Sequence, residues 1–126
     1  GVMDLLDHLI DEGIGLAVVS NKKHDFTLEI IHKYFCDRFK IVLGLRENYK
    51  AKPDPTSLLE VINEFGISKE ECIYIGDSNV DIRTARNAGV KSIGVSWGFR
   101  GGEELLKEGA DYLVNNVEEL KEIIVS

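Results

Sequence analysis

The sequence predicts an α/β protein in which parallel β-strands form a doubly wound sheet. Short apolar runs alternate along the chain with segments that carry the apolar spacing of amphipathic helices. Several of the apolar runs end in glycine or polar residues, as buried parallel strands do at the edge of a sheet. The length of 126 residues suits one domain, and no repeat, low-complexity run or linker divides the chain. We therefore expect a single domain over residues 1–126.

Each helix is predicted from apolar residues that lie three or four positions apart on one face. In chain order, the expected helices cover residues 2–12, 25–35, 56–65, 82–88, 101–107 and 117–124. Glycines that follow three of these helices are typical of C-caps, namely Gly13, Gly66 and Gly89.

Each strand is predicted from a short, continuous apolar run bounded by polar residues or glycine. In chain order, the expected strands cover residues 14–19, 39–43, 72–75, 92–97 and 110–114, and the fourth ends at Gly98. A polar loop is expected over residues 46–54, between the second strand and the third helix. This alternation of strand and helix is the pattern of a doubly wound sheet.

The composition excludes some classes of function. The formal net charge is −7, so we expect no broad basic surface for nucleic acid or for an anionic membrane. Cys36 and Cys72 lack the spacing of metal ligands, which favours a reduced, cytoplasmic protein. No apolar run is long enough to span a bilayer, and no signal peptide is visible.

The stretch from Cys72 to Asp81 is the centre of the predicted site. Gly76 interrupts the apolar run, Asp77 follows at the strand's end, and Asp81 comes four residues later. Ligands of such sheets bind beyond the carboxyl ends of the strands, and two carboxylates there suit Mg²⁺. The structural alternative is that Asp77 or Ser78 only caps the next helix.

Two further polar groups follow strands of the predicted sheet. Ser20 and Asn21 stand at the tip of the first strand, and Lys52 lies in the loop after the second. Ser20 could equally be an N-cap, and Lys52 could be a solvated loop lysine. Taken together, a hydroxyl donor, an ammonium and a carboxylate pair are what phosphoryl transfer requires. We expect Ser20, Lys52, Asp77 and Asp81 to converge on one edge of the sheet.

The sequence resembles the haloacid dehalogenase superfamily, and within it the phosphoglycolate phosphatase-like branch, over essentially the whole chain. The segments that carry the resemblance are Ala17-Val18-Val19-Ser20-Asn21-Lys22, Lys52-Pro53-Asp54-Pro55, Gly76 and Asp77 with Asp81, Ala85, Ala88-Gly89 and Trp97-Gly98-Phe99. The first three stand for the second, third and fourth motifs of that family, in order and at suitable intervals.

The resemblance implies a Rossmann-like core and a role for each matched residue. Ser20 and the Asn21 backbone N–H would bind phosphoryl oxygens, and Lys52 would offset negative charge. Asp77 would ligate Mg²⁺, and Asp81 would ligate the metal, position a metal-bound water or position the Lys52 ammonium. The neighbouring Lys22, Lys23 and His24 either contact substrate or are simply solvated.

One family motif is absent from the sequence. The Asp-x-Asp motif that ends the family's central first strand supplies its nucleophile and its acid/base; here Asp4 and Asp7 stand instead on a predicted helix. The chain therefore resembles the C-terminal part of the core, without the first strand and without the cap domain. We expect the place of this strand to be filled by a missing N-terminal segment, by a second chain or by direct pairing of the two neighbouring strands.

These observations imply a Mg²⁺-dependent phosphatase that acts on a small phosphorylated metabolite, such as phosphoglycolate, through an aspartyl-phosphate intermediate. Without its nucleophile, the chain alone is expected to be inactive. The alternative is a non-catalytic fragment or binding module that keeps the metal and phosphate site or pairs with a partner chain. A receiver-type signalling domain is disfavoured, because its acidic pair precedes its lysine, whereas here Lys52 precedes Asp77.

Overall fold

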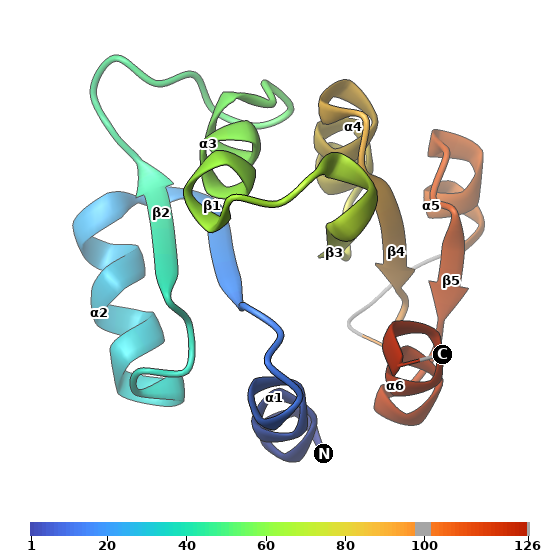
Figure 1. The fold of residues 1–126 in the computed structure, drawn as a ribbon. Coiled ribbons are helices and arrows are strands. Elements are labelled where there is room, and N and C mark those ends of the chain that lie inside the picture. Colours follow the sequence, from blue (N-terminus) through green and yellow to red (C-terminus); the bar gives the residue numbers. More distant parts are fainter. Residues whose placement is uncertain (98–101, 126) are drawn as a thin grey trace. The chain divides into compact units, whose positions relative to one another are not determined.

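The computed structural model describes residues 1–97 and 102–125. It confirms the α/β class with parallel strands (Figure 1). The chain divides into two compact units, Gly1–Lys52 and Pro53–Ser126, which are described separately below. The sequence predictions for Gly98, Phe99 and Gly101 lie outside the described residues.

The first unit contains two helices and a two-stranded parallel sheet. Its elements are α1 (Val2–Asp11), β1 (Ala17–Lys23), α2 (His24–Phe35) and β2 (Ile41–Leu45). Figure 1 shows α2 running alongside β2. Leu5 and Leu9, one turn apart on α1, are both buried, as the predicted apolar face requires.

Strand β1 differs from its prediction, because it begins three residues later and continues to Lys23. Ser20 and Asn21 therefore lie within the strand and not beyond its tip. The pairing of β1 with β2 is regular from Ala17 to Val19 and then shifts before Lys23. Such an irregularity bends a strand and redirects its side chains, and here it falls on the polar residues of the candidate site.

The second unit contains a three-stranded parallel sheet in the order β3-β4-β5. Its elements are α3 (Thr56–Phe65), the 3-10 turn η1 (Lys69–Glu71), β3 (Ile73–Gly76), α4 (Asn79–Ala88), β4 (Lys91–Val95), α5 (Gly102–Glu108), β5 (Tyr112–Val114) and α6 (Val117–Val125). Helices α3 and α4 end at Gly66 and Gly89, both in the left-handed conformation expected of a C-cap.

One buried cluster of this unit lies where α3 meets the end of α4 and the start of β4. Its buried members are Leu58, Ile62, Ala88 and Val90. The thiol of Cys72 packs against them, and burial raises its pKa, so this cysteine behaves as a core residue. Both cysteines of the chain are free thiols.

The strands β1 and β3 each have one hydrogen-bonded neighbour among the described strands of their own sheet, β2 and β4 respectively. The expected single sheet is thus present as two parallel sheets, as a fold that lacks its central strand would be. Two alternate residues of β3, Ile73 and Ile75, are 38% and 42% exposed. Alternate side chains of a strand point to the same face of its sheet, so this face of β3 is partly uncovered.

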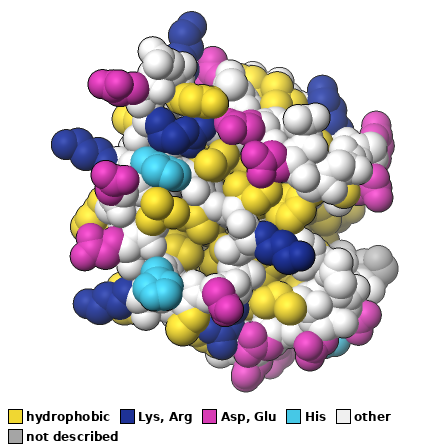
Figure 2. Space-filling view, turned by 60° about the vertical axis from the view of Figure 1, so that its left-hand side comes forward, with side chains coloured by type: hydrophobic (Ala, Val, Ile, Leu, Met, Phe, Trp, Pro, Cys, Tyr) yellow, Lys and Arg dark blue, Asp and Glu magenta, His cyan; other side chains and the backbone are white. Residues whose placement is uncertain are grey.

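The surface has no broad area of one charge in the view of Figure 2. Charged side chains of both signs alternate there with hydrophobic ones. Within the described ranges 1–97 and 102–125, no helix is long and apolar enough to cross a bilayer.

Glu108 ties α5 to α4 through two arginines. Its carboxylate lies 3.0 Å from Arg83 Nη2 and 3.3 Å from Arg86 Nη2, and the glutamate side chain is only 16% exposed. Arg86 Nη1 also donates to the Glu108 carbonyl oxygen over 2.6 Å. The hydrogen bond from Arg83 lowers the pKa of Glu108 below its ordinary value of 4.5. Desolvation acts in the opposite direction, and the charges of both arginines lower the pKa further.

We expect Glu108→Gln to lower the thermal midpoint of unfolding at pH 7, because both charge pairs are lost. A lowered folded-state pKa stabilises the fold above the unfolded-state value, and that contribution disappears as the pH falls through the folded-state pKa. The gap between the wild type and Glu108→Gln should therefore close as the pH falls below 4.5. Glu104→Gln, at an exposed position of the same helix, is the control. A gap that persists in full at pH 2 to 3 would contradict the charge argument.

Candidate active site

The turn between β3 and α4 holds the two predicted metal ligands. Ser78 is the N-cap of α4, and its Oγ accepts a hydrogen bond from the Asp81 N–H over 3.3 Å. The Ser78 hydroxyl donates in return to Asp81 Oδ2 over 3.1 Å, and the Asp77 N–H donates to the same oxygen over 3.2 Å. Asp81, which is buried, therefore stabilises the turn in addition to any other role, while Asp77 is exposed.

This network explains why α4 begins three residues before its predicted start. The capping alternative is correct for Ser78, which closes the first turn of the helix. Capping does not account for the exposed Asp77 carboxylate, which stands directly after the strand.

Gly76 is required by the close approach of β3 to the start of α4. A Cβ at this position would lie 2.2 Å from Asp81 Cβ and 2.6 Å from Asp81 Oδ2. The sequence predicted Gly76 only as the residue that interrupts the strand. Its steric role follows from the way Asp81 folds back over the strand end.

The polar end of β1 holds the predicted phosphate-binding residues. Ser20 Oγ accepts the Lys22 N–H over 3.1 Å, which leaves the hydroxyl hydrogen available to donate to a ligand. Lys52 Nζ donates to the Val19 carbonyl oxygen over 3.1 Å, beside Ser20 in the chain. The backbone of Lys52 is hydrogen-bonded to the Asn21 side chain, a contact that the sequence did not predict.

The three residues after Asn21 make contacts of their own. Lys22 Nζ lies 5.8 Å from the centre of the Phe26 ring, within cation–π range. His24 Nδ1 accepts the Gly44 N–H over 3.0 Å, so a neutral His24 carries its hydrogen on Nε2. Contact of Lys22, Lys23 or His24 with a substrate stays a prediction.

The structure thus brings Ser20, Asn21 and Lys52 together in the first unit, and Asp77 and Asp81 together in the second. The convergence of both groups on one edge stays a prediction. Within residues 1–97 and 102–125, no group of three or more His, Cys, Asp or Glu side chains could hold a metal. The Asp pair can therefore supply only part of a Mg²⁺ coordination shell, which usually includes several waters.

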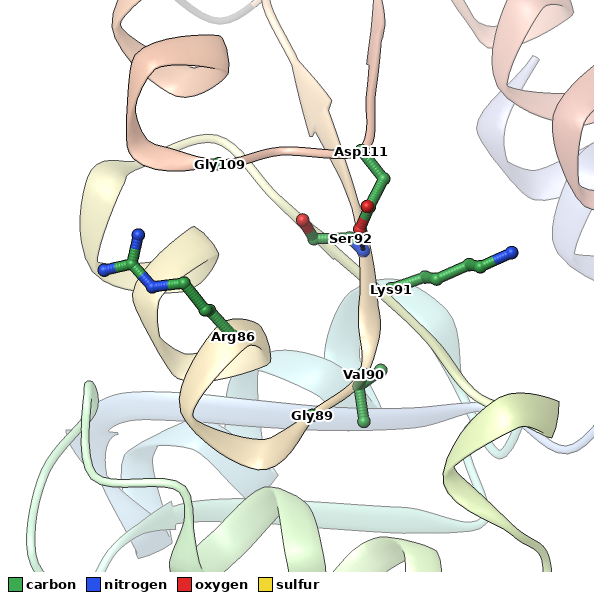
Figure 3. Close-up of a pocket in the computed structure, with 7 residues that line it drawn as sticks. All are labelled: Arg86, Gly89, Val90, Lys91, Ser92, Gly109 and Asp111. Atoms are coloured by element: carbon green, nitrogen blue, oxygen red, sulfur yellow. Dashed lines mark hydrogen bonds between the residues drawn. The ribbon is translucent and has the colours of Figure 1, made fainter.

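A pocket of about 290 Å³ lies at the other end of the second unit's sheet, where β4 begins. Figure 3 shows Arg86 and Lys91 pointing in opposite directions around it. The Asp111 carboxylate accepts the Ser92 N–H over 2.8 Å, and Arg86 is occupied by Glu108. Its charged groups do not converge on a ligand, and its place at the amino ends of the strands sets it apart from the candidate site.

Comparison with known proteins identifies relatives over nearly the whole chain. The family described as Haloacid dehalogenase-like hydrolase matches residues 1–95. A pyrophosphatase PpaX of Listeria monocytogenes is 31% identical and covers 98% of this chain and 58% of its own length. A phosphoglycolate phosphatase of Pseudomonas fluorescens is 31% identical and covers 95% of this chain and 44% of its own length.

Solved structures agree with these sequence relatives. A candidate phosphoglycolate phosphatase from Lactobacillus delbrueckii subsp. bulgaricus is 38% identical, with a TM-score of 0.92. The match covers 98% of this chain and 52% of that one. The chain thus spans about half the length of the relatives that it matches.

Proposed function

Because the chain belongs to the haloacid dehalogenase-like hydrolase family, we propose that it is part of a Mg²⁺-dependent phosphatase. The proposed substrate is a small phosphorylated metabolite such as phosphoglycolate, and pyrophosphate is the alternative that the Listeria relative's name suggests. Hydrolysis would pass through an aspartyl-phosphate whose nucleophile lies outside these 126 residues. The absence of Asp-x-Asp at a strand end and the coverage of half the relatives' length both support this reading.

The arrangement at the end of β1 carries the proposal. Ser20 offers a hydroxyl hydrogen, and Lys52 brings an ammonium to the adjacent Val19 carbonyl. A hydroxyl and an ammonium at one strand end can stabilise the negative oxygens of a phosphoryl group. Ser20 and the Asn21 N–H would bind those oxygens, and Lys52 would offset the charge that they share with the nucleophile.

Asp77 and Asp81 fit Mg²⁺ in the chemistry of their oxygens, because hard cations prefer carboxylates. Asp77 is the exposed ligand of the turn, while one oxygen of Asp81 accepts two hydrogen bonds within it. A bound Mg²⁺ would neutralise charge on the phosphoryl oxygens. Asp81 would then position the Lys52 ammonium or a metal-bound water. We also propose that the whole protein is cytoplasmic.

The second candidate is a binding fragment without turnover, and the open edge of β3 favours it. Ile73 and Ile75 stay partly exposed, and β4 is the one neighbour of β3 among the described strands of its sheet. A strand from an N-terminal segment, or from a second chain, would pair with this edge and cover both side chains.

A hydrolysis assay separates the two candidates. We expect the 126-residue chain with Mg²⁺ to leave p-nitrophenyl phosphate, phosphoglycolate and pyrophosphate unhydrolysed. Loss of a nucleophile typically removes several orders of magnitude in rate. The same chain extended by its natural upstream sequence should hydrolyse at least one of the three if that sequence encodes Asp-x-Asp. Turnover by the short chain, or none by an extended chain that carries Asp-x-Asp, would overturn the proposal.

A further inference from the structure

A pair of hydrogen bonds joins Asn21 on β1 to the backbone of Lys52, 31 residues later. Asn21 Nδ2 donates to the Lys52 carbonyl oxygen over 3.2 Å, and the Lys52 N–H donates to Asn21 Oδ1 over 2.7 Å. We call this pair the Asn21 clamp. In this clamp, the Asn21 side chain binds both the backbone N–H and the backbone C=O of Lys52.

Only a carboxamide suits this arrangement. Asparagine carries a donor and an acceptor side by side, so it can accept a hydrogen bond from the N–H of a residue and donate one to the C=O of the same residue. Aspartate would place a second acceptor opposite the Lys52 carbonyl oxygen. The irregular pairing of β1 between Val19 and Lys23 accompanies the clamp, since it frees this part of the strand from the regular ladder with β2.

The clamp fixes the backbone from which the Lys52 side chain starts. That side chain then reaches back along β1 to place Nζ 3.1 Å from the Val19 carbonyl oxygen, beside Ser20. A lysine has four rotatable bonds, so an unfixed backbone would let its ammonium sample many positions. With the clamp in place, the ammonium is held at the carbonyl oxygen of Val19, the residue that precedes Ser20.

We infer that the Asn21 side chain is a positioning residue that holds the Lys52 ammonium at the phosphate site. The inference rests on the proposed function and adds a role to the Asn21 side chain, whereas that function uses only its backbone N–H. Asn21 is exposed, so its replacement removes little core packing. The consequences of replacing it should therefore arise from the two hydrogen bonds.

The first measurement is amide exchange at Lys52 in the 126-residue chain, followed by NMR. We expect Asn21→Ala to accelerate exchange of the Lys52 N–H by roughly threefold to tenfold, the usual net value of one hydrogen bond. Asn63→Ala, the same substitution at an exposed position of α3, is the control. If exchange at Lys52 is unchanged in Asn21→Ala, the clamp does not exist in solution and the inference fails.

The second measurement is a titration with inorganic phosphate, followed through the Lys52 side-chain CH₂ resonance next to Nζ. Lys52→Ala, followed at Ser20, should weaken binding by about tenfold or more, as the loss of a charged hydrogen bond does. Asn21→Ala should weaken it by roughly threefold to tenfold, and the double variant should bind no more weakly than Lys52→Ala alone. This lack of additivity is the signature of positioning, because a general loss of stability would add to the effect of Lys52→Ala.

Three outcomes decide between the inference and its premise. Unchanged phosphate affinity in Asn21→Ala, or full additivity with Lys52→Ala, would overturn the inference and leave the phosphate site intact. Absence of any phosphate effect at Ser20 and Lys52 in the wild-type chain would refute the proposed function, and the positioning role with it. Asn21→Leu, which is close to asparagine in size and has neither the donor nor the acceptor, should repeat the faster exchange if Asn21→Ala does not fold.

Discussion

Gly76→Ala is expected to lower the free energy of unfolding by about 3 kcal/mol or more, the upper range for overpacking. The new Cβ would lie 2.2 Å from Asp81 Cβ and 2.6 Å from both Asp81 Cγ and Oδ2. Asp81 cannot move aside cheaply, because the turn holds its carboxylate through Asp77 and Ser78. The strand end and the first turn of α4 must separate instead.

Gly66→Ala is the matched control for this prediction. Gly66 has a φ of +66° and nothing within 4 Å of an added Cβ, so alanine there costs only the left-handed backbone conformation. That cost is about 1–2 kcal/mol. Urea denaturation of the two variants measures the difference. Equal losses, or a smaller loss in Gly76→Ala, would show that Asp81 does not press on the strand.

Lys52→Ala should have the largest effect on turnover in a longer, active form of the protein. The loss of one preorganised donor to a developing oxyanion typically lowers kcat about 10²–10³-fold, and we expect Lys52→Ala to fall in this range. The Mg²⁺ concentration for half-maximal rate should change little, because Lys52 is assigned to phosphoryl charge.

Asp77→Asn should raise the Mg²⁺ concentration required for half-maximal rate, because Asp77 is assigned to the metal.

Titration of activity with Mg²⁺ in both variants tests these two assignments together. Lys121→Ala, at an exposed position of α6, controls for the loss of a lysine elsewhere on the surface. An unchanged Mg²⁺ dependence in Asp77→Asn would remove Asp77 from the metal site. A kcat for Lys52→Ala equal to that of Lys121→Ala would remove Lys52 from the phosphoryl site.

The parts of the fold that depend on local periodicity could be predicted from the sequence. The bounds of α3 are as expected, because its apolar face and the glycine after it are both local signals. The predicted start of α4 was three residues too late, because the true start depends on a side-chain cap and not on apolar spacing. The extent of β1 was wrong because polar residues continue the strand where an apolar run predicts its end.

The candidate residues could be named from the sequence, but their contacts could not. Asn21 and Lys52 are separated by 31 positions, and whether they meet depends on the path of the intervening chain. The clearance at Gly76 likewise depends on how Asp81 turns back, which no local pattern encodes. Family resemblance supplied roles for the residues, whereas the hydrogen bonds show which of them also support one another.

The Asn21 clamp has a consequence for how this region can change over evolutionary time. Residues 46–51 connect β2 to Lys52, and the Asn21 clamp anchors the backbone of Lys52 to β1. Surface loops tolerate substitution and insertion readily, and longer loops cost little additional closure entropy. The loop can therefore drift in length and composition while the ammonium keeps its place. Asn21 also lies on the surface, but its substitution would remove the clamp and release the backbone of Lys52.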